Sequence, residues 1–202
     1  MSDQEILAQL RQGDEDAYRQ LVERFQQKVF NTAVNFLQNQ QDAEDIAQEV
    51  FIQVYHSIGQ FKENASLSTW IYRITISKCL DHTRNKRRKK RFAFISRLFT
   101  DDNQLLHDAT DFEHPGIQLD RKENAAILFR TVNQLPDSQK TAFLLNKVDG
   151  LSYHEIADVM KLSESAVDSL LQRARQNLRK KIEQEIDFLE KGIFKQRASK
   201  KQ

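Results

Sequence analysis

Four polar side chains recur at intervals of three or four residues between positions 42 and 53, so they share one face of a helix. They are Asp42, Asp45, Glu49 and Gln53. Grouped carboxylates can bind a metal ion, act as catalytic acids and bases, or bind a basic protein. A di-metal helical site uses Glu-x-x-His pairs, which the chain lacks, and the pattern suggests no partner histidine or nucleophile for catalysis. Two interpretations of this face therefore remain: it binds a basic partner protein, or it is an ordinary solvated surface.

A polar loop running into an aromatic helix follows over residues 61–73. Trp70, Tyr72 and Arg73 lie close together there, after the small polar side chains of Asn64 and Ser66. Aromatic faces beside cations and small polar groups suit the stacking and reading of single-stranded bases. The alternative is that Trp70 belongs to the core.

A basic run extends from Arg84 to Arg91, with seven basic residues in eight positions. Runs of this kind are often solvated helix ends or tails. Because this one follows an aromatic helix, it could also bind phosphates in a strongly salt-sensitive way.

Residues 151–179 have the pattern of a helix-turn-helix. Ser152 and Glu155 predict a capping box for a short helix, Leu162 is expected to fill the angle after the turn, and Ser163 is expected to cap a longer second helix. On the second helix, short or acidic groups suit base edges and arginines suit phosphates: Glu164, Ser165, Ser169, Gln172, Arg173 and Arg175. A helical hairpin that binds a protein has the same local pattern.

Helices must position these groups, because five glycines and two prolines in 202 residues leave few tight turns or hairpins. Asp14 is expected to cap the second helix and Asp137 a later one, while Leu128 is expected to face inward. Helical periodicity predicts two groups of helices, over 3–11, 14–36, 42–59 and about 68–90, and then over 120–132, 138–147, 153–160 and 164–190.

The predicted fold is all-α, with two small helical domains joined by a flexible linker and a helix-turn-helix in the second domain. Acidic residues and His114-Pro115-Gly116 mark the linker. The expected boundaries are 1–91 for the first domain, 92–119 for the linker, with a transient helix near 94–99, 120–182 for the second domain and 183–202 for a C-terminal extension.

Composition narrows the class of protein. The net charge of +2 is too small for bulk electrostatics to draw the chain to nucleic acid, so the distribution of charge matters more. Cys79 is the only cysteine, which excludes an internal disulfide and argues against a cysteine-based metal site. The first thirteen residues lack the apolar core of a signal peptide, and no run of eighteen apolar residues occurs. We expect a cytoplasmic protein without cofactor, metal or small-molecule substrate.

Taken in chain order, these segments resemble the extracytoplasmic-function sigma factors of bacterial RNA polymerase. The resemblance covers about residues 15–90 and 120–182. Residues 42–51, 68–74 and 79–81, followed by the basic run, resemble region 2 of the family. Region 4 resembles Leu135-Pro136, Phe143, residues 150–157, Ser165-Ala166-Val167 and Arg173-Ala174-Arg175.

The resemblance implies a non-enzymatic initiation factor that binds core polymerase, recognises the −35 and −10 promoter elements and promotes strand opening. It implies docking on the β′ clamp helices through Asp42, Asp45, Gln48, Glu49 and Phe51. For the −10 element it implies Lys62, Asn64, Ser66, Trp70, Arg73, Ser77, Arg84, Lys86, Arg87 and Arg88. For the −35 element it implies Ser163, Glu164, Ser165, Ser169, Gln172, Arg173 and Arg175. An anti-sigma factor and the polymerase β flap are further implied partners.

The chain departs from the family pattern in three places. Ser77 stands where many members have asparagine, and Glu164 and Asp168 make the start of the recognition helix less basic. Residues 182–202 extend past region 4 with a partial apolar stripe that could continue the last helix. Two other functions are open to the residues alone: a stand-alone helix-turn-helix regulator, and a carboxylate-rich metalloenzyme that would retain iron or manganese.

Overall fold

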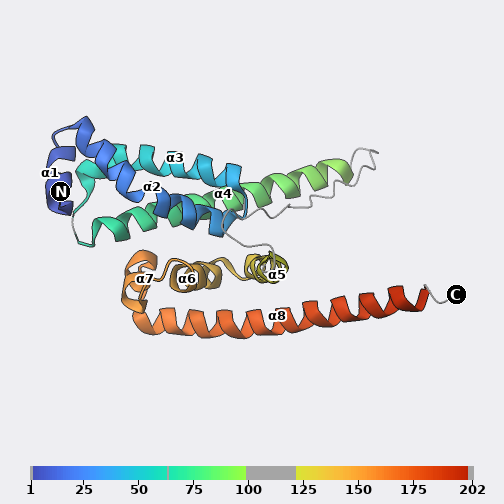
Figure 1. Cartoon of the computed structure of the whole chain (residues 1–202). Helices are drawn as coiled ribbons and strands as arrows, with labels where there is room; N and C mark the ends of the chain where they lie inside the picture. The colour runs from blue at the N-terminus through green and yellow to red at the C-terminus, as the bar shows by residue number, and fades with distance from the viewer. Residues whose placement is uncertain (1, 63, 99–121, 200–202) are drawn as a thin grey trace. The chain divides into compact units, whose positions relative to one another are not determined.

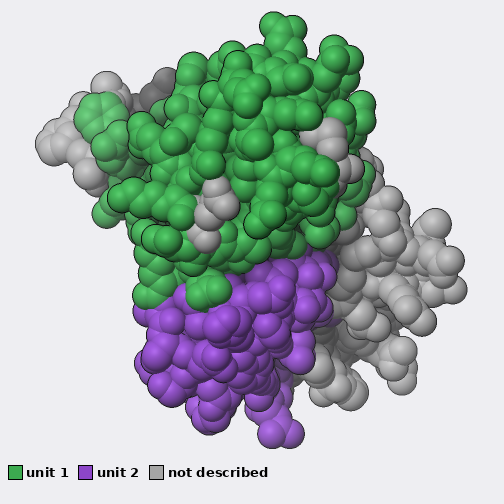
Figure 2. All heavy atoms as spheres, turned by 90° about the vertical axis from the view of Figure 1, so that its left-hand side faces the viewer, with its two compact units in different colours: residues 1–114, 158–161 green, residues 115–157, 162–202 purple. Residues whose placement is uncertain are grey.

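The computed structural model describes the backbone of residues 2–62, 64–98 and 122–199, and the side chains of residues 2–62, 64–92 and 127–184. Every regular element in this part of the chain is a helix, which confirms the predicted all-α class (Figure 1). The chain divides into two compact units (Figure 2). Unit 1 comprises residues 1–114 and 158–161, and unit 2 comprises residues 115–157 and 162–202.

Unit 1 is built on three helices that pack against one another, with a short helix across the beginning of the second (Figure 1). Their bounds are α1 Asp3–Leu10, α2 Glu15–Leu37, α3 Gln40–Ser57 and α4 Leu67–Leu98, with a 3₁₀ turn, η1, at Ile58–Gln60. The core takes one apolar stripe from each long helix: Leu21, Phe25, Val29, Ala33 and Phe36, then Ala43, Ile46, Val50 and Val54, then Leu67, Ile71, Ile76 and Cys79.

Local side-chain caps explain where the helices of unit 1 begin. Asp14 Oδ1 accepts a hydrogen bond from the Ala17 amide at 2.9 Å, so the predicted cap of α2 is confirmed. Asn39 Oδ1 accepts from the Asp42 amide at 2.7 Å, which starts α3 two residues before the expected position. Each such cap contributes about 1 kcal/mol, because it satisfies an amide that has no partner inside the helix.

Unit 2 contains three whole helices, with α8 packed against α5 and α6, and α7 up to Ala157. Their bounds are α5 Lys122–Asn133, α6 Asp137–Lys147, α7 Tyr153–Met160 and α8 Glu164–Ser199. The buried side chains come from all four helices and the turns between them: Val132, Leu135, Ala142, Leu144, Leu145, Ile156, Val167, Leu171, Ala174 and Leu178.

Several expected boundaries and orientations were wrong. The helix α4 continues to Leu98, past the expected start of the linker at residue 92, and residues 99–121 lie outside the described part. Pro136 occupies the N-cap of α6 without a side-chain hydrogen bond, and Asp137 is instead the first helical residue, where a carboxylate favours the helix dipole. Leu128, expected to face inward, is 38% exposed, whereas Val132 of the same helix is buried. The helix α8 continues to Ser199, as the apolar stripe of the tail suggested.

Candidate functional site

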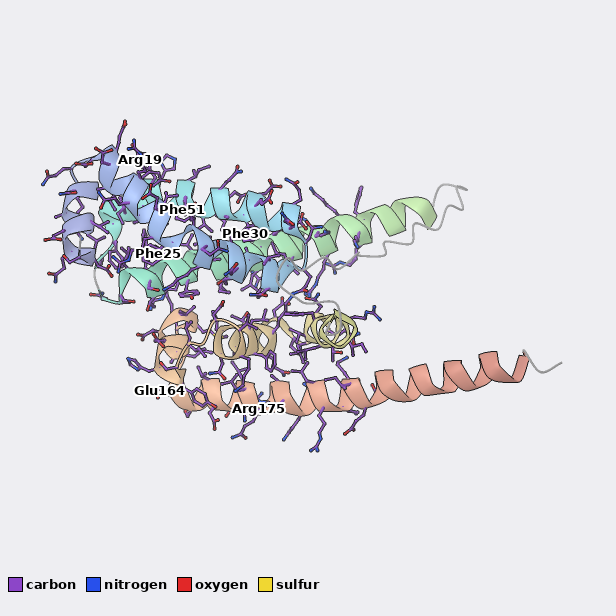
Figure 3. The ribbon with its side chains drawn as sticks, in the orientation of Figure 1. Arg19, Phe25, Phe30, Phe51, Glu164 and Arg175 are labelled. Atoms are coloured by element: carbon purple, nitrogen blue, oxygen red, sulfur yellow. The ribbon has the colours of Figure 1, made fainter. Side chains whose placement is uncertain are left out.

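The acidic face of α3 is present in the structure, and Phe51, which the family resemblance assigns to docking, lies outside it. Asp45, Gln48 and Glu49 are exposed, and Asp42 is half-buried. Phe51 is only 8% exposed and lies in the core of unit 1, where Figure 3 labels it. An apolar side chain on a helix is drawn to the stripe that packs, so Phe51 is not part of the exposed face.

Two exposed apolar residues on α3 were missed by the sequence reasoning. Ile52 and Tyr55 are each 56% exposed. Their spacing from Asp45 and Gln48, at intervals of three and four residues, was the signal that could have found them. We call Asp45, Gln48, Glu49, Ile52 and Tyr55 the α3 face.

Tyr55 is held in place by a neighbouring ring. It packs edge-on against Tyr18 of α2, with ring centroids 5.2 Å apart. The Tyr18 hydroxyl donates to the Phe51 carbonyl at 3.0 Å. Burial, and secondly the adjacent Tyr55, raises the pKa of Tyr18, so the hydroxyl keeps its proton as a donor. The apolar end of the α3 face is therefore positioned by α2.

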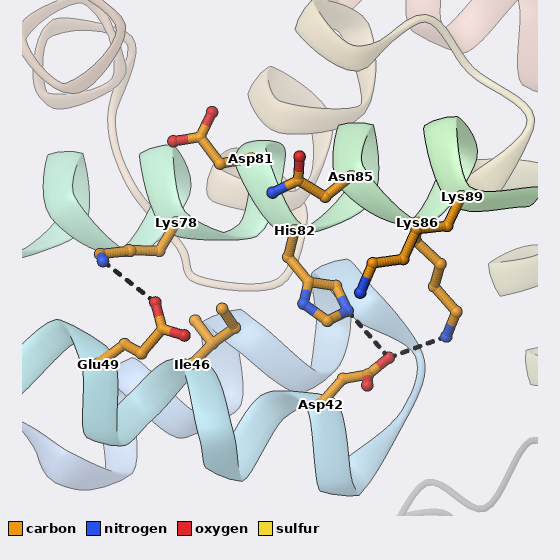
Figure 4. Close-up of a pocket in the computed structure, with 9 residues that line it drawn as sticks. All are labelled: Asp42, Ile46, Glu49, Lys78, Asp81, His82, Asn85, Lys86 and Lys89. Atoms are coloured by element: carbon orange, nitrogen blue, oxygen red, sulfur yellow. Dashed lines mark hydrogen bonds and ion pairs between the residues drawn. The ribbon is translucent and has the colours of Figure 1, made fainter. Parts of the chain in front are cut away.

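Carboxylates of α3 and cations of α4 face each other across a groove of about 510 Å³ (Figure 4). Lys86 Nζ lies 3.0 Å from Asp42 Oδ2, and His82 Nε2 lies 3.2 Å from the same oxygen, outside hydrogen-bond geometry. Lys78 Nζ lies 3.1 Å from Glu49 Oε2. Lys78, His82 and Lys86 follow one another at intervals of four residues, so they form a single row along α4.

This row joins two sets of residues that the sequence reasoning had kept apart. Lys86 was predicted to contact DNA, and Asp42 and Glu49 were predicted to contact a protein. The fold places Lys86 on Asp42 and adds Lys78 to Glu49, a pairing that sequence reasoning missed. The only sign of this pairing in the sequence was the opposite charge of two helical rows, whose paired residues are 29 and 44 positions apart.

The aromatic start of α4 is half-buried. Trp70 packs against Phe61 with ring centroids 4.9 Å apart and an interplanar angle of 36°. Ser66 Oγ accepts from the Thr69 amide at 3.0 Å, so this predicted DNA contact also caps the helix. Most of the other predicted −10 residues are exposed along the loop and α4: Lys62, Asn64, Ser77, Arg84, Arg87 and Arg88. Arg73 lies on α4 about two turns after the loop.

The predicted helix-turn-helix is formed by α7 and the first turns of α8. The Ser152 amide donates to Glu155 Oε2 at 2.8 Å and the Glu155 amide to Ser152 Oγ at 3.3 Å, which confirms the capping box. Ser163 Oγ accepts from the Ala166 amide at 3.2 Å and caps α8 as expected. Lys161 makes the turn with a left-handed backbone, φ 56°. Leu162, expected to fill the angle, is 42% exposed instead.

The predicted −35 residues stand together on the first turns of α8. All are exposed except Ser169, which is half-buried: Ser163, Glu164, Ser165, Gln172, Arg173 and Arg175. Figure 3 shows Glu164 at the beginning of the helix and Arg175 three turns further along. Two residues of α7, which sequence reasoning had not singled out, contact this face. Tyr153 Oη accepts from Arg175 at 3.0 Å, and His154 Nδ1 lies 3.0 Å from Glu164 Oε1.

Three further properties of the described residues bear on function. No group of three or more His, Cys, Asp and Glu side chains among them is arranged to hold a metal ion. None of the helices in this part of the chain combines the length and the apolar character that crossing a membrane requires. Cys79 is fully buried, as expected of a small apolar side chain in the core.

Comparison with known families finds two matches in the order of the two units. The family "Sigma-70 region 2" matches residues 21–89, and "Sigma-70, region 4" matches residues 125–178. The RNA polymerase sigma-H factor of Pseudomonas aeruginosa is 32% identical over 90% of this chain and 94% of its own length. The ECF RNA polymerase sigma-E factor of Haemophilus influenzae is 30% identical over 91% and 96%.

Two solved structures are similar in fold. CnrH, in complex with the cytosolic domain of CnrY, aligns with a TM-score of 0.62 at 22% identity, over 88% of this chain and 94% of that chain. The sigma factor RpoE of Bartonella quintana, in complex with the anti-sigma factor NepR, aligns with a TM-score of 0.58 at 18% identity, over 82% and 96%. At these identities the likeness shows the fold alone.

The ion pairs Lys78–Glu49 and Lys86–Asp42 should contribute little to stability, because their side chains remain partly exposed. We expect Lys86→Met and Lys78→Met each to change the free energy of unfolding by less than about 1 kcal/mol. Urea unfolding followed by the fluorescence of Trp70, the only tryptophan, reports on this unit. Phe36→Ala, at a side chain 1% exposed, is the control and should cost roughly 3–5 kcal/mol. If a lysine variant lost as much free energy of unfolding as Phe36→Ala, the conclusion that these ion pairs contribute little to stability would be wrong.

Proposed function

Because this chain belongs to the extracytoplasmic-function group of the sigma-70 family, and is thus an alternative RNA polymerase sigma factor, we propose a division of labour between its units. Unit 1 docks on core polymerase and captures the −10 element, and unit 2 reads the −35 element. Sigma factors are non-enzymatic initiation factors, so the chain contributes binding energy rather than chemistry. The proposal rests on the order of three features along the chain. The acidic and apolar α3 face and the basic row of α4 lie within the segment that matches region 2, and the helix-turn-helix lies within the segment that matches region 4.

The α3 face is the proposed contact with the β′ clamp helices. Its charged members, Asp45 and Glu49, suit a basic surface, and Ile52 and Tyr55 supply apolar area. Interfaces gain most of their energy from a few aromatic or apolar anchors within a polar surround. Ile52 and Tyr55 therefore replace the buried Phe51 in the proposed contact.

Docking is proposed to change the partners of the basic row on α4. Lys86 cannot neutralise a DNA phosphate fully while it is paired with Asp42 at 3.0 Å. A basic polymerase surface that approaches Asp42 and Glu49 competes with Lys86 and Lys78 for the same oxygens. Each surface pair is worth under about 1 kcal/mol, so the exchange is cheap and readily reversed. Polymerase binding would then make the basic row more available to DNA.

Promoter opening is proposed at the start of α4. Trp70 is half-buried against the buried ring of Phe61 and follows Asn64 by six residues in the sequence, and the amide of Asn64 can both donate and accept hydrogen bonds. Single-stranded bases stack on aromatic rings with about 1–3 kcal/mol per base. Capture of an unstacked base there stabilises the melted strand, while Arg84, Arg87 and Arg88 hold nearby phosphates.

Regulation by an anti-sigma factor is part of the proposal. CnrH and RpoE, which share the fold, were each solved with a partner, and RpoE's partner is an anti-sigma factor. A protein that covers the α3 face would block polymerase docking directly. We further propose that unit 2 contacts the β flap through exposed apolar side chains such as Val148, and that the chain acts in the cytoplasm, where polymerase is found.

The isolated chain should bind promoter DNA weakly, and core polymerase should convert this into specific open complexes. The salt sensitivity should be strong, because phosphate contacts release counterions. Gel shift with and without core enzyme, followed by run-off transcription from a genomic promoter pool, measures both steps. Tight operator binding by the chain alone would favour a stand-alone helix-turn-helix regulator instead.

Asp45→Arg should weaken core polymerase binding by about tenfold or more, equivalent to roughly 1.4 kcal/mol, because it places a cation against a basic surface. Fluorescence anisotropy of labelled chain with core enzyme measures the affinity. Glu183→Arg makes the same change of charge on an exposed residue of α8 and serves as the control. Equal affinity for the Asp45 variant and this control would remove the docking assignment.

Asn64→Ala should reduce promoter opening several-fold while core binding stays unchanged, because the loop loses a polar group that reads the captured base. Permanganate reactivity of unpaired thymines reports the open strand. Gln12→Ala, an exposed amide elsewhere in unit 1, is the matched control. Normal opening in the Asn64 variant would argue against base capture by this loop.

A further inference from the structure

Glu164 is an acidic residue at the start of the proposed recognition helix. It is the first residue of α8, directly after the Ser163 cap, and its side chain is 60% exposed. The N-terminal residues of a recognition helix are those that reach base edges in the major groove. DNA phosphates repel a carboxylate, so an acidic side chain there is unfavourable unless it meets a hydrogen-bond donor.

The donors available in the major groove narrow what Glu164 can contact. Cytosine presents its N4 amino group, whereas guanine presents two acceptors and thymine one acceptor and a methyl group. Adenine pairs its N6 donor with the N7 acceptor beside it, which a carboxylate avoids. A carboxylate at this position therefore matches cytosine.

His154 of α7 restricts the carboxylate. Its Nδ1 lies 3.0 Å from Glu164 Oε1, so the histidine engages one carboxylate oxygen and orients the second. A free glutamate side chain must lose rotamer freedom when it binds, and an oriented one loses less. The contact links two residues ten apart in sequence that lie on different helices of the motif.

The other carboxylate on this face is less suited to the role. Asp168 lies one turn further from the beginning of α8, is half-buried and is shorter. Its Oδ2 already accepts from Gln172 Nε2 at 2.9 Å, so the two side chains satisfy each other. Among the residues of α8 whose side chains the structure describes, Glu164 is thus the acidic one that is both exposed and contacted by a side chain of another helix.

We infer that Glu164 is a specificity-determining residue that accepts a hydrogen bond from the N4 amino group of a cytosine in the −35 element, and that His154 is the residue that positions it. The inference rests on the proposed function and deepens it. A contact of this kind discriminates between bases by roughly ten- to a hundredfold.

The test is a change of base preference. Core polymerase with the wild-type chain or Glu164→Gln transcribes a promoter pool with a randomised −35 element, and the transcribed templates are sequenced. The wild type should prefer cytosine on one strand at one position. Glu164→Gln should shift that position toward adenine by about tenfold or more, because a glutamine amide pairs with adenine N6 and N7. All other positions should keep their preferences.

His154 is tested in the same pool. His154→Ala should keep the preferred base but lower the discrimination several-fold at that position alone, and His154→Gln, which retains a donor, should restore part of it. Equal discrimination in wild type and His154→Ala would overturn the positioning role. An unchanged preference in Glu164→Gln, or a loss spread over all sequences, would overturn the assignment of Glu164. Failure of the wild-type chain to initiate with core enzyme would instead overturn the proposed function.

Discussion

The apolar stripe of α3 is the constraint on which the rest of unit 1 depends. Ala43, Val50 and Val54 are completely buried against α2 and α4, so the rotation of α3 about its axis is set. Because a helix has 3.6 residues per turn, the opposite side must carry Asp45, Gln48 and Ile52. The proposed docking surface is therefore a consequence of core packing and needs no element of its own.

The ion pairs between α3 and α4 are weaker than the packing of the core. The carboxylates of Asp42 and Glu49 and the cations of α4 are oriented toward one another, yet they remain partly exposed. Pairs of this kind contribute little to folding and exchange partners easily. That combination suits a factor that must give up contacts within itself when it meets a polymerase and a promoter.

The helix-turn-helix of unit 2 is positioned by contacts between residues that lie close together in the sequence. Side-chain caps at Ser152 and Ser163 define where α7 and α8 begin, and Lys161, with a left-handed backbone, makes the turn between them. Tyr153 and His154 then contact Arg175 and Glu164 from the neighbouring helix. The short helix α7 thus orients two side chains on the exposed face of α8.

The amino-acid sequence alone determined the all-α class, the caps at Asp14, Ser152 and Ser163, and the order of the segments that resemble the family. These depend on residues three or four positions apart, whose contacts a helix dictates. The outward side of Ile52 and the pairing of Lys86 with Asp42 were decided by the tertiary structure. Neighbouring positions on a helix differ by only about 100°, so periodicity leaves its rotation open, and contacts between distant helices exist only once they pack.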